Sequence, residues 1–144
     1  MASYQMRFNS SIDTSREIAA ALLAFWQREG IQAPLVHDLE LCVVELANNI
    51  YEHGYQEQNG KVIDVSCTVL AQKIEITMSH AGLSLKPDRM DEMLSTPLQE
   101  LDPTDPLSWA TSGRGFFILN TLMDEVSVHE NKGLTSFTLI KLRP

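Results

Sequence analysis

The chain has 144 residues, the length of about one domain, and 44% of them are hydrophobic, which is enough to build a buried core. Its 11 lysines and arginines against 19 aspartates and glutamates give a net charge of −8, which excludes nucleic acid and anionic membrane surfaces as general partners. A negatively charged ligand needs a local source of positive potential, such as a helix N-terminus or a bound cation. We expect one domain over residues 1–144.

A strand and a helix are predicted at the start of the chain. Residues 4–9 are mixed in polarity, which is typical of a short edge strand. Ser10 and Ser11 then offer an N-cap for a helix over residues 12–29, whose apolar residues recur at helical spacing. Gly30 follows, and glycine commonly ends a helix by adopting a left-handed backbone.

A second helix and a hairpin come next. Pro34 suits the first turn of a helix that extends to about Glu52 with an apolar stripe along one side. Residues 63–69 and 74–78 alternate apolar and polar side chains, which predicts two strands with one buried face. A turn near residues 71–72 joins these strands as a hairpin.

The rest of the chain combines an irregular segment with a helix and two strands. Four of the six prolines fall between residues 87 and 106, which favours a lid or binding loop with one short helix near residues 89–94. An apolar helix over residues 116–123 precedes two strands, one around Val126 and one over residues 134–142. This order predicts an α+β two-layer sandwich, with helices on one face of a mainly antiparallel, mixed sheet.

The sequence indicates a cytoplasmic protein. Cys42 and Cys67 lie inside apolar stretches without ligands at metal-binding spacing, so we expect both to be reduced core residues. The longest apolar run, residues 18–26, is far shorter than the roughly 20 residues that cross a bilayer. The first residues show no basic segment leading into an apolar one, so no secretory leader is expected.

The most informative polar residues lie on the second predicted helix. Glu45 and Asn49 are one turn apart on the same side, and Glu52 and His53 continue the line. A carboxylate stacked on an amide beside an apolar stripe offers oxygen ligands for Mg²⁺ and a candidate general base. The solvated side of an ordinary amphipathic helix explains the same pattern, so periodicity alone leaves both interpretations open.

Glycines in the second half of the chain offer an anion site. Gly113 and Gly115 precede the predicted helix over residues 116–123, where close backbone approach and unpaired N–H groups suit a phosphate. Arg114 stands between them and has the length to reach such a group. A plain glycine-rich turn with a surface arginine accounts for the same residues. Gly82, after the predicted hairpin, is by itself only a loop glycine.

Taken together, these segments resemble a known family. Residues 45–54 (ELANNIYEHG) resemble the N box of the ATPases that include gyrase, MutL and histidine kinases, in the version found in bacterial anti-sigma-factor serine kinases. Residues 112–119 (SGRGFFIL) and 122–126 (LMDEV) resemble that group's second glycine box and the strand after it. Residues 82–87 (GLSLKP) fall where the first glycine box belongs. The resemblance covers nearly the whole chain and implies the Bergerat ATPase-like fold.

The resemblance implies a protein serine kinase that uses ATP and Mg²⁺. Asn49 would ligate Mg²⁺, and Glu45 would be the general base that deprotonates a serine hydroxyl of a partner protein. The other nucleotide-binding positions implied by the motifs are His53, His80, Gly82, Gly113, Arg114, Gly115 and Phe116. The implied partners are an anti-anti-sigma protein of the STAS type and a sigma factor, and a homodimer is also implied.

The first glycine box departs from the family's pattern at two positions, the second being Lys86, where the family often repeats an Asp. The first glycine box carries an Asp two residues before its Gly, and that carboxylate accepts a hydrogen bond from the adenine amino group, but here the residue is His80. A neutral imidazole offers one acceptor nitrogen, in a single tautomer. Two hypotheses stay open: an ATP-dependent kinase of the partner-switching type, and a nucleotide-independent module that binds its partner through the same surface. We disfavour a detached histidine-kinase catalytic domain, because the sequence shows no dimerisation helix with a phosphoacceptor histidine.

Overall fold

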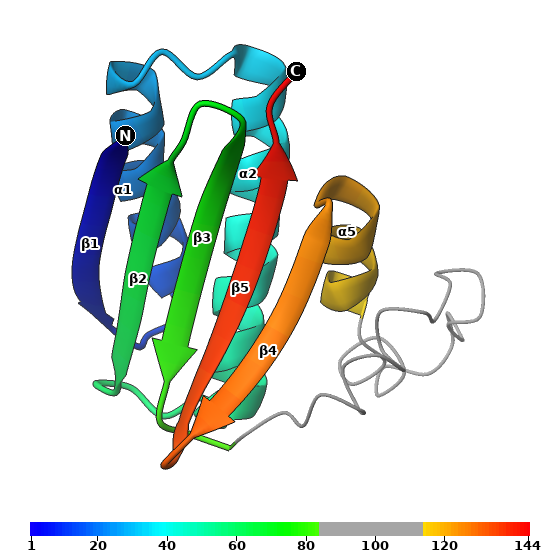
Figure 1. Ribbon diagram of the computed structural model, residues 1–144. Helices are drawn as coiled ribbons and strands as arrows, with labels where there is room; N and C mark the ends of the chain where they lie inside the picture. Colours follow the sequence, from blue (N-terminus) through cyan, green and yellow to red (C-terminus); the bar gives the residue numbers. More distant parts are fainter. Residues whose placement is uncertain (84–113) are drawn as a thin grey trace, which may run out of the picture.

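Figure 1 shows the computed structural model, which describes residues 1–83 and 114–144. In chain order the helices and strands are β1 (Ala2–Asn9), α1 (Thr14–Arg28), α2 (Ala33–Asn49), the π-helical turn η1 (Ile50–Gly54), β2 (Val62–Val69), β3 (Lys73–His80), α5 (Arg114–Leu122), β4 (Glu125–Asn131) and β5 (Leu134–Leu142). The predicted Pro-rich loop over residues 87–106, with its short helix near 89–94, lies outside the described residues. In the described part of the chain, no helix is long and apolar enough to cross a membrane.

The five strands form one sheet in the order β1-β2-β3-β5-β4, and each pairing between these described strands is antiparallel. α1, α2 and α5 cover one face of this sheet (Figure 1). The predicted two-layer α+β sandwich is therefore confirmed, and so is the edge position of the first strand. Because the hairpin β2–β3 lies in the middle, its inward side chains are central to the core.

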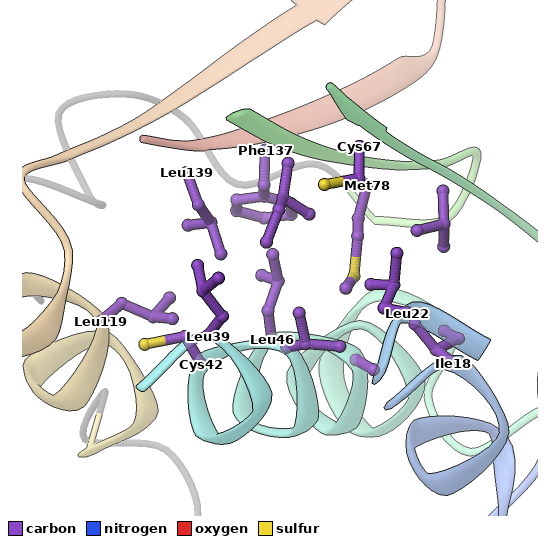
Figure 2. Close-up of a cluster of buried hydrophobic side chains, with 14 of the residues drawn as sticks. Ile18, Leu22, Leu39, Cys42, Leu46, Cys67, Met78, Leu119, Phe137 and Leu139 are labelled. Atoms are coloured by element: carbon purple, nitrogen blue, oxygen red, sulfur yellow. The ribbon is translucent and has the colours of Figure 1, made fainter. Parts of the chain in front are cut away.

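The core fills the space between the two layers. β2 and β3 alternate buried and partly exposed residues, as their period of two predicts. In Figure 2 the inward side chains of the strands meet those of the three helices. The labelled residues come from α1 (Ile18, Leu22), α2 (Leu39, Cys42, Leu46), α5 (Leu119) and the strands (Cys67, Met78, Phe137, Leu139). Burial of one large apolar side chain contributes roughly 1.5 to 3 kcal/mol, so this layer holds the helices on the sheet.

The first helix begins later than the sequence predicts. α1 starts at Thr14, and the serine cap expected from Ser10 and Ser11 is wrong, because no side chain caps this helix. Ser10 is buried instead between the end of β1 and the loop before β2. There its Oγ donates to the carbonyl of Gln58 at 2.6 Å and accepts from the N–H of Lys61 at 2.9 Å.

The second helix changes geometry near its end. α2 has Pro34 in its first turn, as predicted, and after Asn49 the chain continues as the π-helical turn η1. The N–H of Tyr55 donates to the carbonyl of Ile50 at 2.8 Å, which spans one residue more than an α-helical hydrogen bond. The chain is therefore helical through Glu52, as predicted, but its last residues have π-helical and not α-helical geometry.

The end of β3 packs directly on the π-helical turn. A Cβ atom added at Gly82 would lie 2.1 Å from the carbonyl oxygen of Gly54, and one added at Gly54 would lie 2.7 Å from the ring of His80. The N–H of Leu83 donates to the same Gly54 carbonyl at 2.7 Å. Gly82 is therefore more than a loop glycine, because its missing side chain lets β3 end against α2.

The helix α5 is held near both of its ends. In its first turn the buried Phe116 ring lies 6.0 Å, between centroids, from the ring of Phe137 on β5. At its other end Lys141 Nζ, from β5, donates to the carbonyl of Leu122 at 2.6 Å and lies 3.9 Å from Asp38 Oδ2 of α2. A cation at this place also complements the negative end of the helix dipole. α2, α5 and β5 therefore meet at one lysine.

Replacing Gly82 with alanine should destabilise the fold, because the added methyl group collides with a backbone carbonyl. We expect Gly82→Ala to lower the free energy of unfolding by about 3 kcal/mol, measured by urea denaturation. Gly30→Ala is the matched control. Gly30 follows α1 with φ +70°, as predicted, and has no neighbouring atom within 4 Å, so only about 1 kcal/mol of backbone strain is expected there. Equal losses in the two variants would contradict the contact.

Candidate functional site

The predicted polar residues of α2 lie on the side of the helix that faces α5. Asp38, Cys42, Glu45 and Asn49 follow one another at α-helical spacing, which places them along one side. Lys141, which donates to the carbonyl of Leu122 on α5, lies 3.9 Å from Asp38 of this line, and Figure 2 shows Cys42 on the side of α2 toward Leu119 of α5. The line therefore borders the space between the two helices and is more than an ordinary solvated surface.

Glu45 and Asn49 keep the geometry that the sequence predicts. Both belong to the regular part of α2, one turn apart, and both are half-buried. Their carboxylate and amide oxygens are the chemical groups that bind hard divalent cations or accept protons. Glu52 and His53 lie on the π-helical turn, where Glu52 is exposed and His53 is half-buried, so the α-helical line does not continue through them as predicted.

His80 ends β3 as a buried polar residue, with 2% of its surface exposed. Its ring lies against Gly54, edge-on to Tyr55 at 5.4 Å and stacked on Phe137 at 6.0 Å. Burial lowers the pKa of His80 to about 4, so the imidazole is neutral at pH 7. Its Nδ1 accepts a hydrogen bond from the N–H of Gly82 at 3.1 Å. The acceptor nitrogen is therefore already used within the protein.

Thr135 is a second buried polar residue on the same face of the sheet, and sequence analysis missed it. It stands opposite His80 in the register between β3 and β5, with no exposed surface. Its Oγ1 has no hydrogen-bond partner in the structure described. A buried hydroxyl left without a partner costs about 1 to 3 kcal/mol, which marks it for a functional explanation. The alternation of the strand predicts its inward position, but nothing in the sequence shows that its hydroxyl lacks a partner.

The second glycine motif is described in part. Gly113 lies outside the described residues, while Arg114 and Gly115 form the start of α5, where only their backbone is described. Phe116 follows them, and its side chain belongs to the core. A ligand would therefore contact Phe116 through its backbone N–H. The first N–H groups of a helix have no hydrogen-bond acceptor within the helix, and this N–H is one of them.

The described residues contain no group of three His, Cys, Asp or Glu side chains arranged to hold a metal ion. The described residues therefore do not form a complete metal site from protein ligands alone. Mg²⁺ does not require one, because it is usually held by one or two protein oxygens together with water and the phosphates of a nucleotide. The amide oxygen of Asn49 fits a site of that kind.

The two cysteines take no part in this chemistry. Both are free and buried, as predicted. Burial raises the pKa of Cys42 to about 12 and that of Cys67 to about 11. Cys67 also accepts a hydrogen bond from Trp26 Nε1 at 3.4 Å. Neither thiol is ionised at neutral pH, so a cysteine nucleophile is excluded.

A hollow of about 630 Å³ lies past the end of the sheet. Gly54 and Gly82 line it together with three exposed apolar residues, Val62, Leu83 and Leu134. The polar residues of α2 are not part of its wall, so this hollow is distinct from the space between α2 and α5.

Comparisons with known proteins agree with this architecture. The family model described as histidine kinase-like ATPase domain matches residues 8–141. The serine-protein kinase RsbW of Bacillus velezensis is 31% identical over 100 residues, which span 69% of this chain and 61% of that kinase. The enzyme of the same name from Staphylococcus aureus is 28% identical over 134 residues, which span 91% of this chain and 81% of that kinase.

Two solved structures share the fold. A structure of the RsbU and RsbW domains of a Mycobacterium tuberculosis protein superposes with a TM-score of 0.67 at 17% identity, covering 100% of this chain and 34% of that one. A chain of the SiaB–SiaC complex from Pseudomonas aeruginosa superposes with a TM-score of 0.59 at 15% identity, covering 96% of this chain and 89% of that one. At these identities the likeness establishes the architecture alone.

The buried imidazole predicts a pH dependence of stability. Between pH 6.5 and about pH 4 the unfolded chain takes up a proton at His80 and the folded chain does not, so stability falls as the pH falls. From pH 7 to pH 4.5 this residue should cost about 2 to 3 kcal/mol in urea denaturation. His80→Asn keeps an acceptor for Gly82 and should remove that loss, whereas the exposed control His37→Asn should not. The same pH slope in His80→Asn and the unmodified protein would refute a buried neutral imidazole.

Proposed function

This chain belongs to the family of histidine kinase-like ATPase domains, and from that premise we propose that it is an ATP-dependent protein serine kinase. The serine-protein kinases among its relatives support this reaction. The observation that carries the proposal is the pair Glu45 and Asn49, half-buried one turn apart where α2 borders α5. A kinase needs a proton acceptor and a metal ligand close together, and this pair provides both.

The residues of the chain would divide the work as follows. The carbonyl oxygen of Asn49 would hold the divalent metal, taken here to be Mg²⁺, and the carboxylate of Glu45 would accept the proton of the serine hydroxyl. The first backbone N–H groups of α5 would face phosphate oxygens. When bound, the nucleotide supplies the phosphoryl group and the metal offsets its negative charge. The protein's part is thus to hold these groups in place and to accept one proton.

A nucleotide fits the buried polar residues as well as the polar line of α2. Thr135 Oγ1 lacks a partner inside the protein, and a base with hydrogen-bonding edges is a ligand that would supply one. The ends of α2 and β3 meet at Gly54 and Gly82, so these buried groups lie just past the helical turn that carries Asn49. Neighbouring parts of the fold would therefore bind the phosphates and the base of the nucleotide.

We further propose that the phosphorylated serine belongs to a STAS-type anti-anti-sigma protein and that a sigma factor competes for the same kinase. The relatives named as serine-protein kinase RsbW support a partner-switching role. A homodimer in the cytoplasm is part of this proposal. Sedimentation of the purified protein, alone and with a STAS partner, tests the assembly.

The Glu45 carboxylate gives the sharpest test of catalysis. Glu45→Gln should leave Mg²⁺-dependent ATP binding within about twofold in calorimetry, while phosphate transfer to a STAS partner falls at least a hundredfold, because a general base contributes about that much. Glu40→Gln, on the same helix but off the polar line, is the matched control and should retain transfer.

Asn49→Ala should instead weaken ATP binding in the presence of Mg²⁺ and change ATP binding little in the absence of Mg²⁺.

Three results would contradict this assignment. If ATP with Mg²⁺ produced neither heat nor thermal stabilisation at millimolar concentration, the chain would be a nucleotide-independent binding module. If Glu45→Gln lost binding and transfer equally, Glu45 would be a metal ligand or a structural residue. If Glu45→Gln kept full transfer, the proton acceptor would lie elsewhere.

A further inference from the structure

The end of β5 holds the end of α5 with three hydrogen bonds. The N–H of Asp124 donates to the carbonyl of Ile140 at 2.9 Å, and Asp124 Oδ2 accepts from the N–H of Leu142 at 2.6 Å. Between these two contacts, Lys141 Nζ donates to the carbonyl of Leu122, the last residue of α5, at 2.6 Å. Consecutive residues of β5 thus fix the place where α5 ends and β4 begins.

Lys141 differs from the other two contacts because its side chain also reaches α2. Its Nζ lies 3.9 Å from Asp38 Oδ2, and the side chains of Lys141 and Asp38 are 19% and 32% exposed. The pKa of Cys42, one turn after Asp38, is raised to about 12 by burial and by the Asp38 carboxylate, and the charge of Lys141 acts against this rise. Lys141 therefore lies beside the polar line of α2 and at the end of α5.

Stability alone does not explain a lysine between these helices. A largely buried cation loses most of its hydration, and an apolar side chain of similar length often packs in such a place with no loss of stability. The lysine instead connects two defined groups, the Leu122 carbonyl of one helix and the Asp38 carboxylate of the other. These contacts depend on direction, whereas apolar packing does not, so they suit a residue that specifies how α2 and α5 lie relative to each other.

The relative position of the two helices matters because both border the proposed site. Glu45 and Asn49 lie on α2, and the first backbone N–H groups of α5 would face phosphate oxygens. With nine residues, α5 is about 13 Å long, so a tilt of about 5° about its held end moves its first turn by about 1 Å. A displacement of about 1 Å is enough to slow a catalysed reaction about a hundredfold.

We propose that Lys141 is a positioning residue of the kinase site, which ties the end of α5 to α2 and so sets the distance between the first turn of α5 and the pair Glu45 and Asn49. This inference rests on the proposed ATP-dependent function. Lys141 acts through the two helices, because it binds the end of α5 opposite to the phosphate-facing turn. The role of a helix cap alone would account for its contact with the Leu122 carbonyl but not for its reach to Asp38.

Replacing Lys141 should impair the site more than the fold. Lys141→Met keeps most of the side-chain length and removes the donors, so the midpoint of urea denaturation should stay within about 0.5 M of that of the unmodified protein. The kcat of phosphate transfer to a STAS partner should fall about ten- to a hundredfold, while calorimetric ATP affinity in Mg²⁺ changes less than about fivefold. Lys141→Arg keeps the charge and the donors and should restore most of the rate.

Two further variants separate the tie to α2 from the loss of a charge. Asp38→Asn keeps the contact of Lys141 with α5 and weakens only its contact with α2, so transfer should slow about three- to tenfold, and this variant decides the case if Lys141→Met unfolds at lower urea. Arg143→Met is the matched control. Arg143 is half-buried like Lys141, but its hydrogen bonds go to the carbonyls of residues 70 and 72 in the turn between β2 and β3, so transfer should stay within about twofold.

Spin labels report the displacement of α5 without a nucleotide. Labels attached after the substitutions His37→Cys on α2 and Asn120→Cys on α5, both at exposed positions, give the distance between the helices by electron paramagnetic resonance. The two native cysteines are buried thiols and should stay unlabelled. Lys141→Met should shift or broaden the distance distribution, whereas Arg143→Met should leave it unchanged.

The outcomes separate this inference from the function on which it rests. If Lys141→Met transfers phosphate as fast as Arg143→Met, leaves the distance distribution unchanged, loses ATP affinity as much as rate, or is no slower than Lys141→Arg, the positioning role is overturned while the kinase stands. If the unmodified protein neither binds ATP nor transfers phosphate, both fail. A slow Lys141→Met with displaced α5, nearly normal ATP affinity and rescue by Lys141→Arg establishes the inference.

Discussion

The approach of β3 to the end of α2 is the constraint on which the rest of the site depends. A side chain at Gly82 would collide with the carbonyl of Gly54, and one at Gly54 would collide with the ring of His80. The helix changes from α to π geometry after Asn49, and the strand end packs on this π-helical turn. One backbone contact thereby joins the end of α2 to the end of β3, and Figure 1 shows these two ends at the same end of the molecule.

An acidic protein holds an anion only where positive potential is local. With a net charge of −8, the chain would depend, in the proposed function, on the start of α5 and on a metal ion held by Asn49 for that potential. Lys141 does not serve this purpose, because it lies at the opposite end of α5 between the Leu122 carbonyl and Asp38. Its charge balances the negative end of the helix and a neighbouring carboxylate, and so stabilises the wall of the site.

Local patterns predicted the layers and the polar line, and long-range contacts explain what they missed. The alternation along β2 and β3 indicates which face of the sheet is buried, and the apolar stripe indicates which side of α2 is buried. These two patterns were enough to predict the sandwich and the position of Glu45. The π-helical turn packs against the end of β3 at Gly54, a long-range contact that no local pattern reveals. The roles of Ser10 and Thr135 depend on partners, or their absence, in distant segments. One domain over residues 1–144 stays a prediction.

The fixation of α5 has a thermodynamic consequence. Phe116 anchors the first turn in the core and Lys141 holds the last one, so the helix is already ordered in the absence of ligand. Its conformational entropy is lost on folding and does not have to be lost again on association. Preorganisation of this kind leaves more of the interaction energy for telling one ligand from another, and less is consumed in assembling the place where it binds.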